Sequence, residues 1–477
     1  MPFNSRFTSF SVLHVASECS PWSGTGGLGE VARDLPVAQR EQDVTAIMLS
    51  PAYRGVDGTS TQEVAAGRLR VGVFEYDWRV VSPSAARHVW LLDIPALFDR
   101  PSPYSVHGGE YADNVVRFAF LSAVAVELVV RFGFEVLHAH DWQAALAIGL
   151  LRERQVAARS VYTVHNLAFQ GRFSSAWADL LGLSALLRSH AEFFGQLNLT
   201  KLALRLADSV TTVSPQYARE VLTPSFGEGL DGVLRHDVRA LEGILNGVGE
   251  GWDPTCDDAL DVHFSADTIE NRSASRRRLL DDTGLHSATT STLVVMSCRW
   301  TWQKGVDLAL GALRRALGDT DLVVLLMGAG DTNLEEQTRQ LVREYSGRVA
   351  WQASWSDRTH RRLLGAADLL LMPSRFEPCG LTQLQAMRYG TLPVVTPVGG
   401  LVDTVRDCRI HEDGTGFVCE SVHEDAVTNT LRDAVRARDH RDTWQNTIRC
   451  AMTRPFSWQG AAARYLSLYQ ELLRNRP

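Results

Sequence analysis

The sequence has no uninterrupted apolar run of about 18 residues, the length that a membrane-spanning helix needs. Its first residues, Met1–Phe10, lack a charged stretch followed by an apolar one, so we expect no secretory signal. Cysteine is also scarce: seven residues are scattered singly, and no Cys-x-x-Cys pair occurs. Such a set is typical of a reducing compartment and gives no structural zinc motif. We therefore expect a cytoplasmic protein without a membrane partner.

An excess of positive charge is missing as well. The chain has 48 Lys and Arg against 55 Asp and Glu, which gives a formal net charge of -7. That balance disfavours a nucleic-acid partner, which would call for a basic surface. A locally basic pocket for a phosphate ligand stays open. The sequence also contains no repeat and no low-complexity tract.

The 477 residues are too many for one ordinary core, so two or three domains are expected. Short apolar runs alternate with amphipathic stretches such as Asn114–Val130 and Trp142–Arg152. This alternation predicts mostly parallel sheets with helices on both faces. The first set of predicted strands is Ser11–Ala16, Thr45–Ser50, His88–Leu92, Glu135–His138, Val161–Val164 and Ser209–Val213.

The alternation restarts in the second half of the chain. Between the two sets lies Asn246–Ala288, rich in Gly, Asp, Thr and Ser, which is the best candidate for a hinge although its end could hold a short helix. Apolar residues at helical spacing predict a terminal helix over Ser457–Arg474. Ligands of doubly wound sheets bind beyond the strand C-termini. The second set of strands is Thr292–Ser297, Leu322–Met327, Val349–Gln352, Leu369–Met372 and Leu392–Thr396.

A glycine-rich loop, Gly24–Glu30, follows the first predicted strand. Glycines let a backbone approach a ligand closely, and a helix starting near Gly29 or Glu30 would point N–H groups at an anion. An ordinary βα turn is the alternative.

Two polar groups end neighbouring strands, His138–Gln143 and Thr163–Leu167. The His165-Asn166 pair is well placed to hydrogen-bond a hydroxylated ligand, although a core histidine is the alternative for His165. We do not interpret His138, His140 and Asp141 as metal ligands, because no third cluster has ligand spacing and His138 is expected to point into the core.

Two loops of the second half carry charge. In Arg299–Gly305 two cations five residues apart can clamp one diphosphate, Arg as a bidentate fork and Lys304 as a point charge. In Ser374–Gln383 the carboxylate of Glu377 precedes Pro378, which holds it extended and could present it to the crevice. A solvated basic loop and a surface Glu are the ordinary alternatives.

Together these motifs resemble the glycogen and starch synthase family of glycosyltransferases, almost from end to end. Ser374–Gln383 is long and unusual, which makes the resemblance specific. The other blocks similar to the family's, in its order, are Gly24–Val31, His138–Trp142, Thr163–Gly171, Thr211–Pro215, Gly243–Gly247, Arg299–Gly305, Gly399–Val405 and Phe456–Trp458.

The resemblance implies the α/β GT-B fold, two Rossmann-like domains facing a central cleft. It implies an acceptor domain over residues 1–245, a nucleotide-sugar domain over 246–455, and a C-terminal helix, 456–477, that packs back on the first. It implies a hexosyltransferase that moves glucose from ADP-glucose to the non-reducing end of an α-1,4-glucan, glycogen or a maltooligosaccharide, with retention. No cofactor and no metal are implied, and oligomeric state is left open.

The resemblance also implies residue roles. Arg299 and Lys304 should grip the donor diphosphate, Glu377 should contact the donor glucose, and His165 should donate to that glucose beside the scissile bond. The same comparison assigns substrate-binding roles to Gly26, Gly27, Glu30, Asp141, Asn166, Lys201, Asn246, Trp355, Cys379, Gly380, Leu381 and Thr382, with Trp355 stacking on the adenine and residues 380–382 offering backbone contacts to the phosphates.

One position departs from the family pattern. The family's glycine loop begins with Lys, and here that position is Gly24. Lys201 could substitute for the missing charge, the donor could differ, or the chain could be an inactive glucan-binding homologue. Because Arg299, Lys304 and Glu377 are all present, we favour an active enzyme, with another retaining GT-B glucosyltransferase as the alternative.

Overall fold

The computed structural model describes residues 10–55, 60–106, 109–285 and 291–475. The expectations for the first nine residues and for residues 286–288 of the hinge lie outside these ranges. The chain divides into two compact units: an N-terminal unit, Met1–Asn246 with Trp458–Pro477, and a C-terminal unit, Gly247–Ser457. Within the described residues, no helix combines the length and the apolar character that a bilayer crossing requires.

The N-terminal unit is built on a sheet that has nine strands among the described residues. From β14 to β5 neighbouring strands are parallel, whereas β4 runs antiparallel to both β5 and β3. In sheet order the strands are β14 (Leu241–Gly243), β13 (Ser209–Thr212), β9 (Arg159–Val164), β8 (Val136–His140), β1 (Ser11–Val15), β2 (Thr45–Pro51), β5 (Val89–Asp93), β4 (Phe74–Pro83) and β3 (Thr61–Val71).

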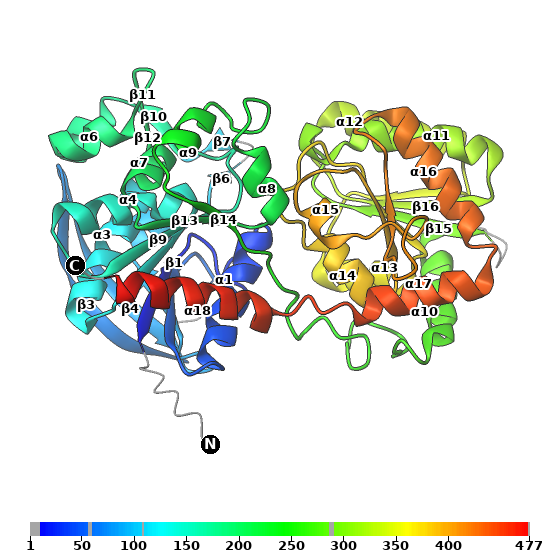
Figure 1. Cartoon of the computed structure of the whole chain (residues 1–477), viewed down its shortest axis with the longest axis horizontal. Coiled ribbons are helices and arrows are strands. Elements are labelled where there is room, and N and C mark those ends of the chain that lie inside the picture. The colour runs from blue at the N-terminus through cyan, green and yellow to red at the C-terminus, as the bar shows by residue number, and fades with distance from the viewer. Residues whose placement is uncertain (1–9, 56–59, 107–108, 286–290, 476–477) are drawn as a thin grey trace. The chain divides into compact units, whose positions relative to one another are not determined.

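Helices cover both faces of this sheet (Figure 1). One face packs under α3 (Asn114–Phe132), α4 (Asp141–Glu153) and α7 (Leu199–Leu206), with α3 and α4 side by side. The other packs under α1 (Gly27–Arg40) and α18 (Trp458–Arg474). Successive side chains of a strand point to opposite faces of the sheet, so each strand contributes to both cores. In β1, Leu13 packs in the core under α3 and α4, and Val12 packs in the core under α1 and α18.

Shorter elements complete this unit. They are the helices α2 (Pro95–Phe98), α5 (Trp177–Leu180), α6 (Ala185–Ala191), α8 (Pro215–Glu220) and α9 (Asp231–His236), the pair β6 (Ser105–Val106) and β7 (Gly109–Glu110), and a small sheet of β10 (Arg172–Ser174), β12 (Gln196–Asn198) and β11 (Glu192–Phe193).

The C-terminal unit has a fully parallel sheet, with six strands among the described residues. Its strand order, 3-2-1-4-5-6 when counted along this unit, is that of a dinucleotide-binding sheet. In sheet order the strands are β17 (Val349–Gln352), β16 (Leu322–Met327), β15 (Thr292–Ser297), β18 (Leu369–Met372), β19 (Leu392–Val395) and β20 (Phe417–Val418).

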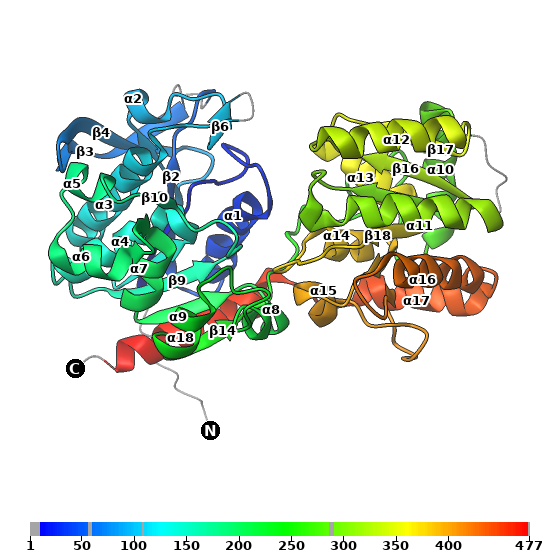
Figure 2. The ribbon, with the colours of Figure 1, turned by 90° about the horizontal axis from the view of Figure 1, so that it is seen from above.

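Two helical layers enclose this second sheet as well (Figures 1 and 2). One contains α11 (Val306–Asp319), α12 (Thr332–Glu344) and α16 (Glu424–Ala437), and the other contains α10 (Arg272–Thr283), α13 (Asp357–Ala366), α14 (Thr382–Arg388) and α17 (Arg441–Thr453). The hinge expected from the sequence thus contains α10. A short helix, α15 (Gly399–Thr404), follows β19.

Candidate functional site

Each sheet has one point where the strand order reverses, and several of the predicted site residues follow the strands beside it. In the N-terminal unit the reversal lies between β1 and β8. The glycine loop follows β1, Asp141 follows β8 and His165 follows β9. In the C-terminal unit it lies between β15 and β18, which are followed by Arg299 and Glu377. Because the strands are parallel, these loops leave the same edge of their own sheet, where ligands of such sheets bind.

The glycine loop is exposed at residues 24–27 and is anchored by a buried acid, Glu18. The backbone N–H of Thr25 donates to Glu18 Oε2 at 2.5 Å, and its hydroxyl donates to Oε1 at 2.8 Å. Tyr104 also donates its hydroxyl to Oε1. Helix α1 begins at Gly27, with Gly26 as its N-cap, and not near Gly29 as expected. Glu18 was missed from sequence, although a lone acid directly after an apolar strand was a signal.

Asp141 shapes the loop that carries His165. It adopts a left-handed backbone with φ of 57°, as strained residues at functional sites do. One oxygen of its carboxylate accepts the backbone N–H of His165 at 2.7 Å, and the backbone of Asn166 also hydrogen-bonds to the carboxylate. Burial nevertheless raises the pKa of Asp141 to about 7. The side chain of Asn166 closes a local turn by accepting the N–H of Ala168. Asp141, His165 and Asn166 are thus brought together as expected.

A cluster of three buried histidines lies behind this loop, and it adds to His138 and His140 a third residue, His14, that ligand spacing in the sequence did not reveal. His14 pairs with His138 across β1 and β8, and one ring nitrogen of each of the three lies within 4.8 Å of the others. Such a group could hold a metal ion. The partner was missed because His14 lies far away in sequence and strand register is not readable there.

The hydrogen bonds of the cluster join it into a polar network. His14 contacts Gln39 and His140, His138 contacts Tyr469 of α18 and Thr163, and His140 also contacts His165. All six ring nitrogens of the three histidines therefore already have protein partners. Burial lowers the pKa of His138 and His140 well below the usual range, which keeps the rings neutral.

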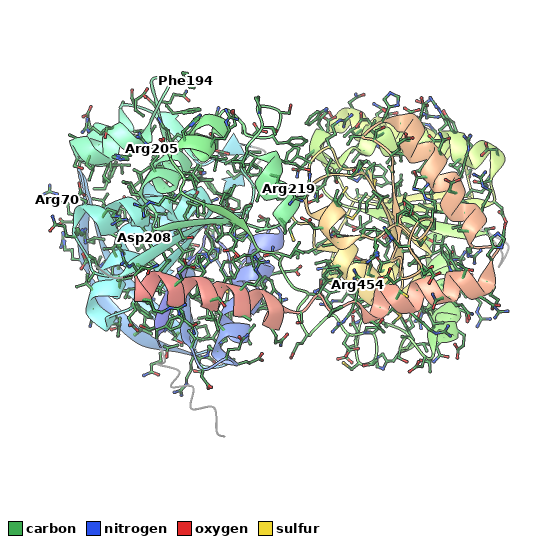
Figure 3. All side chains as sticks on the ribbon, viewed as in Figure 1. Arg70, Phe194, Arg205, Asp208, Arg219 and Arg454 are labelled. Atoms are coloured by element: carbon green, nitrogen blue, oxygen red, sulfur yellow. The ribbon has the colours of Figure 1, made fainter. Side chains whose placement is uncertain are left out.

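Lys201 points to a different part of the N-terminal unit. Its Nζ donates to the Glu192 carbonyl and lies 5.8 Å from the centre of the Phe193 ring. These residues line a cavity of about 500 Å³ together with Phe194, which projects from the turn of the hairpin formed by β11 and β12 (Figure 3). The charge of Lys201 is therefore engaged by this hairpin. Among the described residues it has no contact with the glycine loop, so its substitution for the missing Lys finds no support. Asn246 is buried and ends the unit after β14.

In the C-terminal unit, the two charged loops contact each other through an ion pair. Lys304 Nζ lies 2.6 Å from Glu377 Oε2, and the Ser374 hydroxyl donates to the same oxygen at 3.0 Å. The Glu377 side chain is 7% exposed and that of Lys304 21% exposed. Gly305 makes this approach possible: with φ of 62°, it lies where a Cβ would be 2.0 Å from the Pro373 carbonyl. The sequence predicted both residues for the site but not their pairing.

Arg299 differs from Lys304. Its side chain is exposed and has no hydrogen-bond or ion-pair partner among the described residues. Trp300 beside it is buried and stacks on Trp351 with ring centres 5.2 Å apart, which ties the loop to the core. Trp302 is 66% exposed and lies under the Arg375 guanidinium. Arg299 is therefore free to meet an anion.

The loop after β18 continues past Glu377 as a close-packed turn. The N–H of Gly400 donates to the Glu377 carbonyl, and a Cβ on Gly400 would lie 2.1 Å from the carbonyl oxygen of buried Cys379. Gly380 has a φ of 71°, and Leu381 and Thr382 begin α14. Trp355 is 57% exposed and lies 5.9 Å from the His360 ring. Its indole face is thus accessible.

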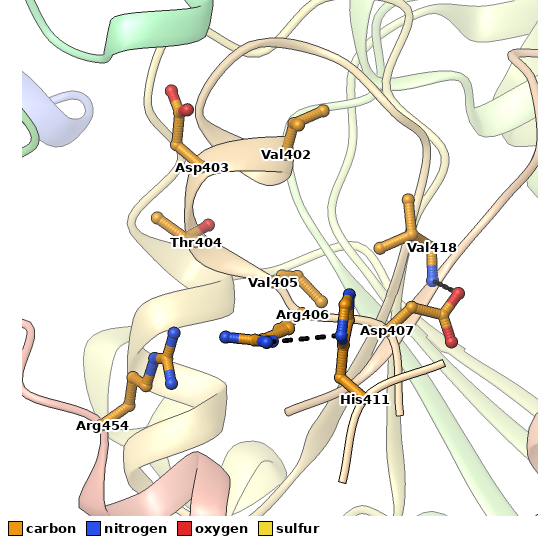
Figure 4. Close-up of a pocket in the computed structure, with 9 residues that line it drawn as sticks. All are labelled: Val402, Asp403, Thr404, Val405, Arg406, Asp407, His411, Val418 and Arg454. Atoms are coloured by element: carbon orange, nitrogen blue, oxygen red, sulfur yellow. Dashed lines mark hydrogen bonds between the residues drawn. The ribbon is translucent and has the colours of Figure 1, made fainter. Parts of the chain in front are cut away.

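A separate cavity of about 290 Å³ lies beyond α15 (Figure 4). Its wall includes Arg406, His411 and Arg454. The charges of both arginines are offset by Asp413, which lies 3.1 Å from Arg406 and 3.4 Å from Arg454. None of the predicted site residues lines this cavity.

Comparison with known proteins matches both units. The family model described as starch synthase catalytic domain matches residues 11–236, and the one described as glycosyl transferases group 1 matches residues 281–449. A glycogen synthase of Anaeromyxobacter dehalogenans is 39% identical over 97% of this chain and 99% of its own length. A glycogen synthase of Yersinia pseudotuberculosis is 40% identical over 97% and 100%.

Solved structures agree with the sequence relatives. The catalytic domain of starch synthase IV from Arabidopsis thaliana, bound to ADP and acarbose, superposes with a TM-score of 0.90 at 27% identity, over 98% of this chain and all of that one. A sucrose-phosphate synthase from Thermosynechococcus elongatus, 18% identical with a TM-score of 0.62, shares the fold. The two doubly wound units are those of a GT-B enzyme, and the chain belongs to the glycogen synthase and starch synthase family of glycosyltransferases.

Proposed function

We propose that this enzyme transfers glucose from ADP-glucose to the non-reducing 4-hydroxyl of an α-1,4-glucan, with retention of configuration. The observation that carries the proposal is the ion pair of Lys304 with buried Glu377, on the same loop as Arg299, which has no side-chain partner among the described residues, at the strand reversal of the C-terminal unit. Two cations and one carboxylate are the groups needed to hold a diphosphate and a neutral sugar side by side.

In this mechanism the C1–O bond to the diphosphate breaks as the bond from C1 to the acceptor O4 forms on the same face. The proton of the 4-hydroxyl passes to an oxygen of the departing diphosphate, so no separate general base is required. Arg299 and Lys304 offset the negative charge that develops on the leaving group. Glu377, held by Lys304 and Ser374, contacts hydroxyls of the donor glucose.

We propose ADP as the nucleotide of the donor. The accessible face of Trp355 can stack on an adenine base, and the backbone of residues 380–382 can meet the phosphates. The related starch synthase IV structure contains ADP together with acarbose. A glucan such as glycogen or a maltooligosaccharide is the acceptor that this comparison supports.

We propose further that the reaction needs no metal ion. Cationic side chains supply the charge at the diphosphate, and the histidine cluster of the N-terminal unit uses its nitrogens for protein hydrogen bonds. All seven cysteines are free, which supports the reducing, cytoplasmic location inferred from their spacing.

The test is a donor panel with glycogen as acceptor and ADP-, UDP- or GDP-glucose as donor, each with and without EDTA. We expect glucose incorporation to be fastest with ADP-glucose and unchanged by EDTA, and to be lost in Arg299→Ala. Faster transfer from another donor would replace ADP-glucose, and EDTA inhibition reversed by Mg²⁺ would refute the metal-free mechanism. If no donor is used and ADP does not bind in calorimetry, the alternative of a glucan-binding homologue that lost activity with the loop Lys replaces the enzyme.

A further inference from the structure

A hydrogen-bonded chain of side chains runs from the core of the N-terminal unit to His165. Gln39 Oε1 lies 2.8 Å from His14 Nε2, His14 Nδ1 lies 3.1 Å from His140 Nε2, and His140 Nδ1 lies 3.0 Å from His165 Nε2. Gln39, His14 and His140 are each at most 1% exposed, whereas His165 is half-buried at the end of β9. The path thus joins α1 to the predicted sugar site through three strands.

The donors and acceptors in this series of hydrogen bonds are set by Gln39, which presents its Oε1 to His14 and its Nε2 to Tyr469. An amide oxygen only accepts, so His14 must carry its proton on Nε2. A neutral imidazole with one protonated nitrogen accepts at the other. His140 therefore donates from Nε2 to His14, and His165 donates from Nε2 to His140.

Neutral rings are what this environment favours. Burial lowers the pKa of His14 to about 4 and that of His165 to about 3, and it lowers the pKa of His140 well below its usual range. With every ring neutral, each position in the chain has one donor and one acceptor. The state of the last ring then follows from the first.

We propose that Gln39, His14 and His140 are positioning residues that hold His165 as its Nε2–H tautomer, with Nδ1 as a hydrogen-bond acceptor for a hydroxyl of the donor sugar. Nδ1 of His165 has no partner within the part of the chain that the structure describes, which leaves it available. The sugar contact rests on the proposed function. It reverses the role expected from the family resemblance, in which this ring donates.

A fixed tautomer of His165 would select one orientation of the sugar hydroxyl that contacts its ring. An acceptor at Nδ1 obliges the hydroxyl to donate to the ring, which leaves its oxygen lone pairs for other donors. A chain fixed from the core also keeps this arrangement before the substrate arrives, so no proton has to be relocated during binding.

The test uses the whole protein labelled with ¹⁵N-histidine and no ligand. Two-bond ¹H–¹⁵N spectra separate protonated from unprotonated ring nitrogens, and His165→Gln identifies the signals of His165 among the 14 histidines. We expect Nε2 of His165 to be protonated and Nδ1 to be unprotonated. Gln39→Met, which keeps the chain length but removes the acceptor, should mix the two tautomers of His165.

Thr211→Val is the matched control, since Thr211 belongs to the same buried network but lies on its other branch, beyond Thr163. We expect it to leave the His165 spectrum unchanged. In steady-state assays with ADP-glucose, Gln39→Met should lower kcat/KM about 10-fold, as for loss of one neutral hydrogen bond, and Thr211→Val should not.

A protonated Nδ1 in wild-type His165 would overturn the proposal, and so would a Gln39→Met spectrum identical to wild type. The wild-type spectrum keeps the proposal falsifiable if Gln39→Met does not fold. Because the spectra need neither donor nor acceptor, failure of every donor in the panel would refute the proposed function and leave the tautomer result standing.

Discussion

The Lys304–Glu377 contact makes the two cations of the C-terminal unit unequal. Lys304 is the ion-pair partner of a buried carboxylate, whereas Arg299 is exposed and unpaired among the described residues. We expect Arg299→Ala to lower kcat with ADP-glucose by about 10²–10³-fold, because one preorganised partner of the leaving group is lost. Its free energy of unfolding in urea should stay within about 0.5 kcal/mol of wild type.

Lys304→Ala should lose turnover similarly but should also lower the free energy of unfolding by about 1–3 kcal/mol, since Glu377 is left without its cation. The double variant Lys304→Ala, Glu377→Gln is the control, and it should regain much of that stability but no activity. If Lys304→Ala and Arg299→Ala had the same free energy of unfolding, the ion pair of Lys304 with Glu377 would contribute nothing to folding.

Gly24 is a second position where one side chain decides the outcome. Its φ is outside the left-handed region, and a Cβ would lie 2.9 Å from Ser20 Oγ, a small group that can rotate away. A lysine should therefore fit and restore a positive charge. We expect Gly24→Lys to raise kcat/KM with ADP-glucose about 10-fold, because a positive charge offsets the negative charge that develops on the leaving diphosphate.

Gly24→Met separates this charge from the loss of loop flexibility, because it has a similar unbranched side chain without the ammonium group. We expect Met to give less than half of the gain seen with Lys, in the same steady-state assay. A well-folded Gly24→Lys protein that is no faster than a brisk wild type would show that other groups have taken over the role of the lysine.

At the level of elements, the junction of β8 and α4 should respond to pH through Asp141. Burial raises its pKa from 3.8 to about 7, so the folded protein retains a proton that the unfolded chain releases in this range. The contribution of Asp141 to the free energy of unfolding is therefore complete below about pH 4, and it is lost as the pH rises through 7. The variant Asp141→Asn has no carboxyl to ionise, so its free energy of unfolding should not fall in this way. Asn also tolerates the positive φ of this position.

We therefore expect the free energy of unfolding of Asp141→Asn, relative to wild type, to increase between acid and neutral pH in urea titrations. Asp77→Asn is the control, because the Asp77 side chain is 81% exposed and should give a flat difference. A flat difference for Asp141→Asn too would mean that the Asp141 carboxyl has the same pKa in the folded and the unfolded chain.

Helix α18 contributes a polar contact as well as apolar ones. The buried Tyr469 hydroxyl accepts from Gln39 Nε2 at 3.3 Å and lies 2.6 Å from His138 Nδ1. Tyr469→Phe should lower the free energy of unfolding by about 1–3 kcal/mol, since both partners stay buried without it. Arg464→Ala, on the exposed side of α18, should change stability by less than about 0.5 kcal/mol and serves as its control.

These elements also show what the sequence could predict. Apolar runs such as Thr292–Ser297 and Leu322–Met327 are buried on both faces, and their strands have the predicted bounds. The hairpin of β3 and β4 was not predicted, because many of its residues are exposed and polar and give no apolar run. Its antiparallel pairing adds an edge to the otherwise parallel sheet.

Site residues followed the same rule. Residues at strand ends, such as His165 and Glu377, could be found because their position along the chain places them at the sheet edge. The residues behind His165 in its hydrogen-bonded chain, His14 and Gln39, could not, since their contacts depend on strand register and on helix packing across a sheet face. The pairing of Lys304 with Glu377 was likewise hidden, because it needs the close approach of two loops at Gly305.

For the whole molecule, the assigned roles divide between the two units. Arg299, Lys304, Trp355 and the turn at 380–382, which we assign to the nucleotide, belong to Gly247–Ser457. His165, which we assign to the sugar, belongs to the N-terminal unit. ADP carries the base and both phosphates but no glucose. Affinity for ADP should therefore depend on one unit, whereas turnover should depend on both.

We expect Arg299→Ala to weaken ADP binding in titration calorimetry by about 10–100-fold, the loss of a hydrogen bond to a charged group. His165→Ala should change the same dissociation constant less than about 3-fold, yet lower kcat with ADP-glucose and glycogen strongly, because its contact is made only when glucose is present. The matched comparison is each variant with ADP and with ADP-glucose under identical conditions. If His165→Ala weakened ADP as much as Arg299→Ala does, the histidine would contribute to nucleotide binding as well, and the division of roles between the units would be wrong.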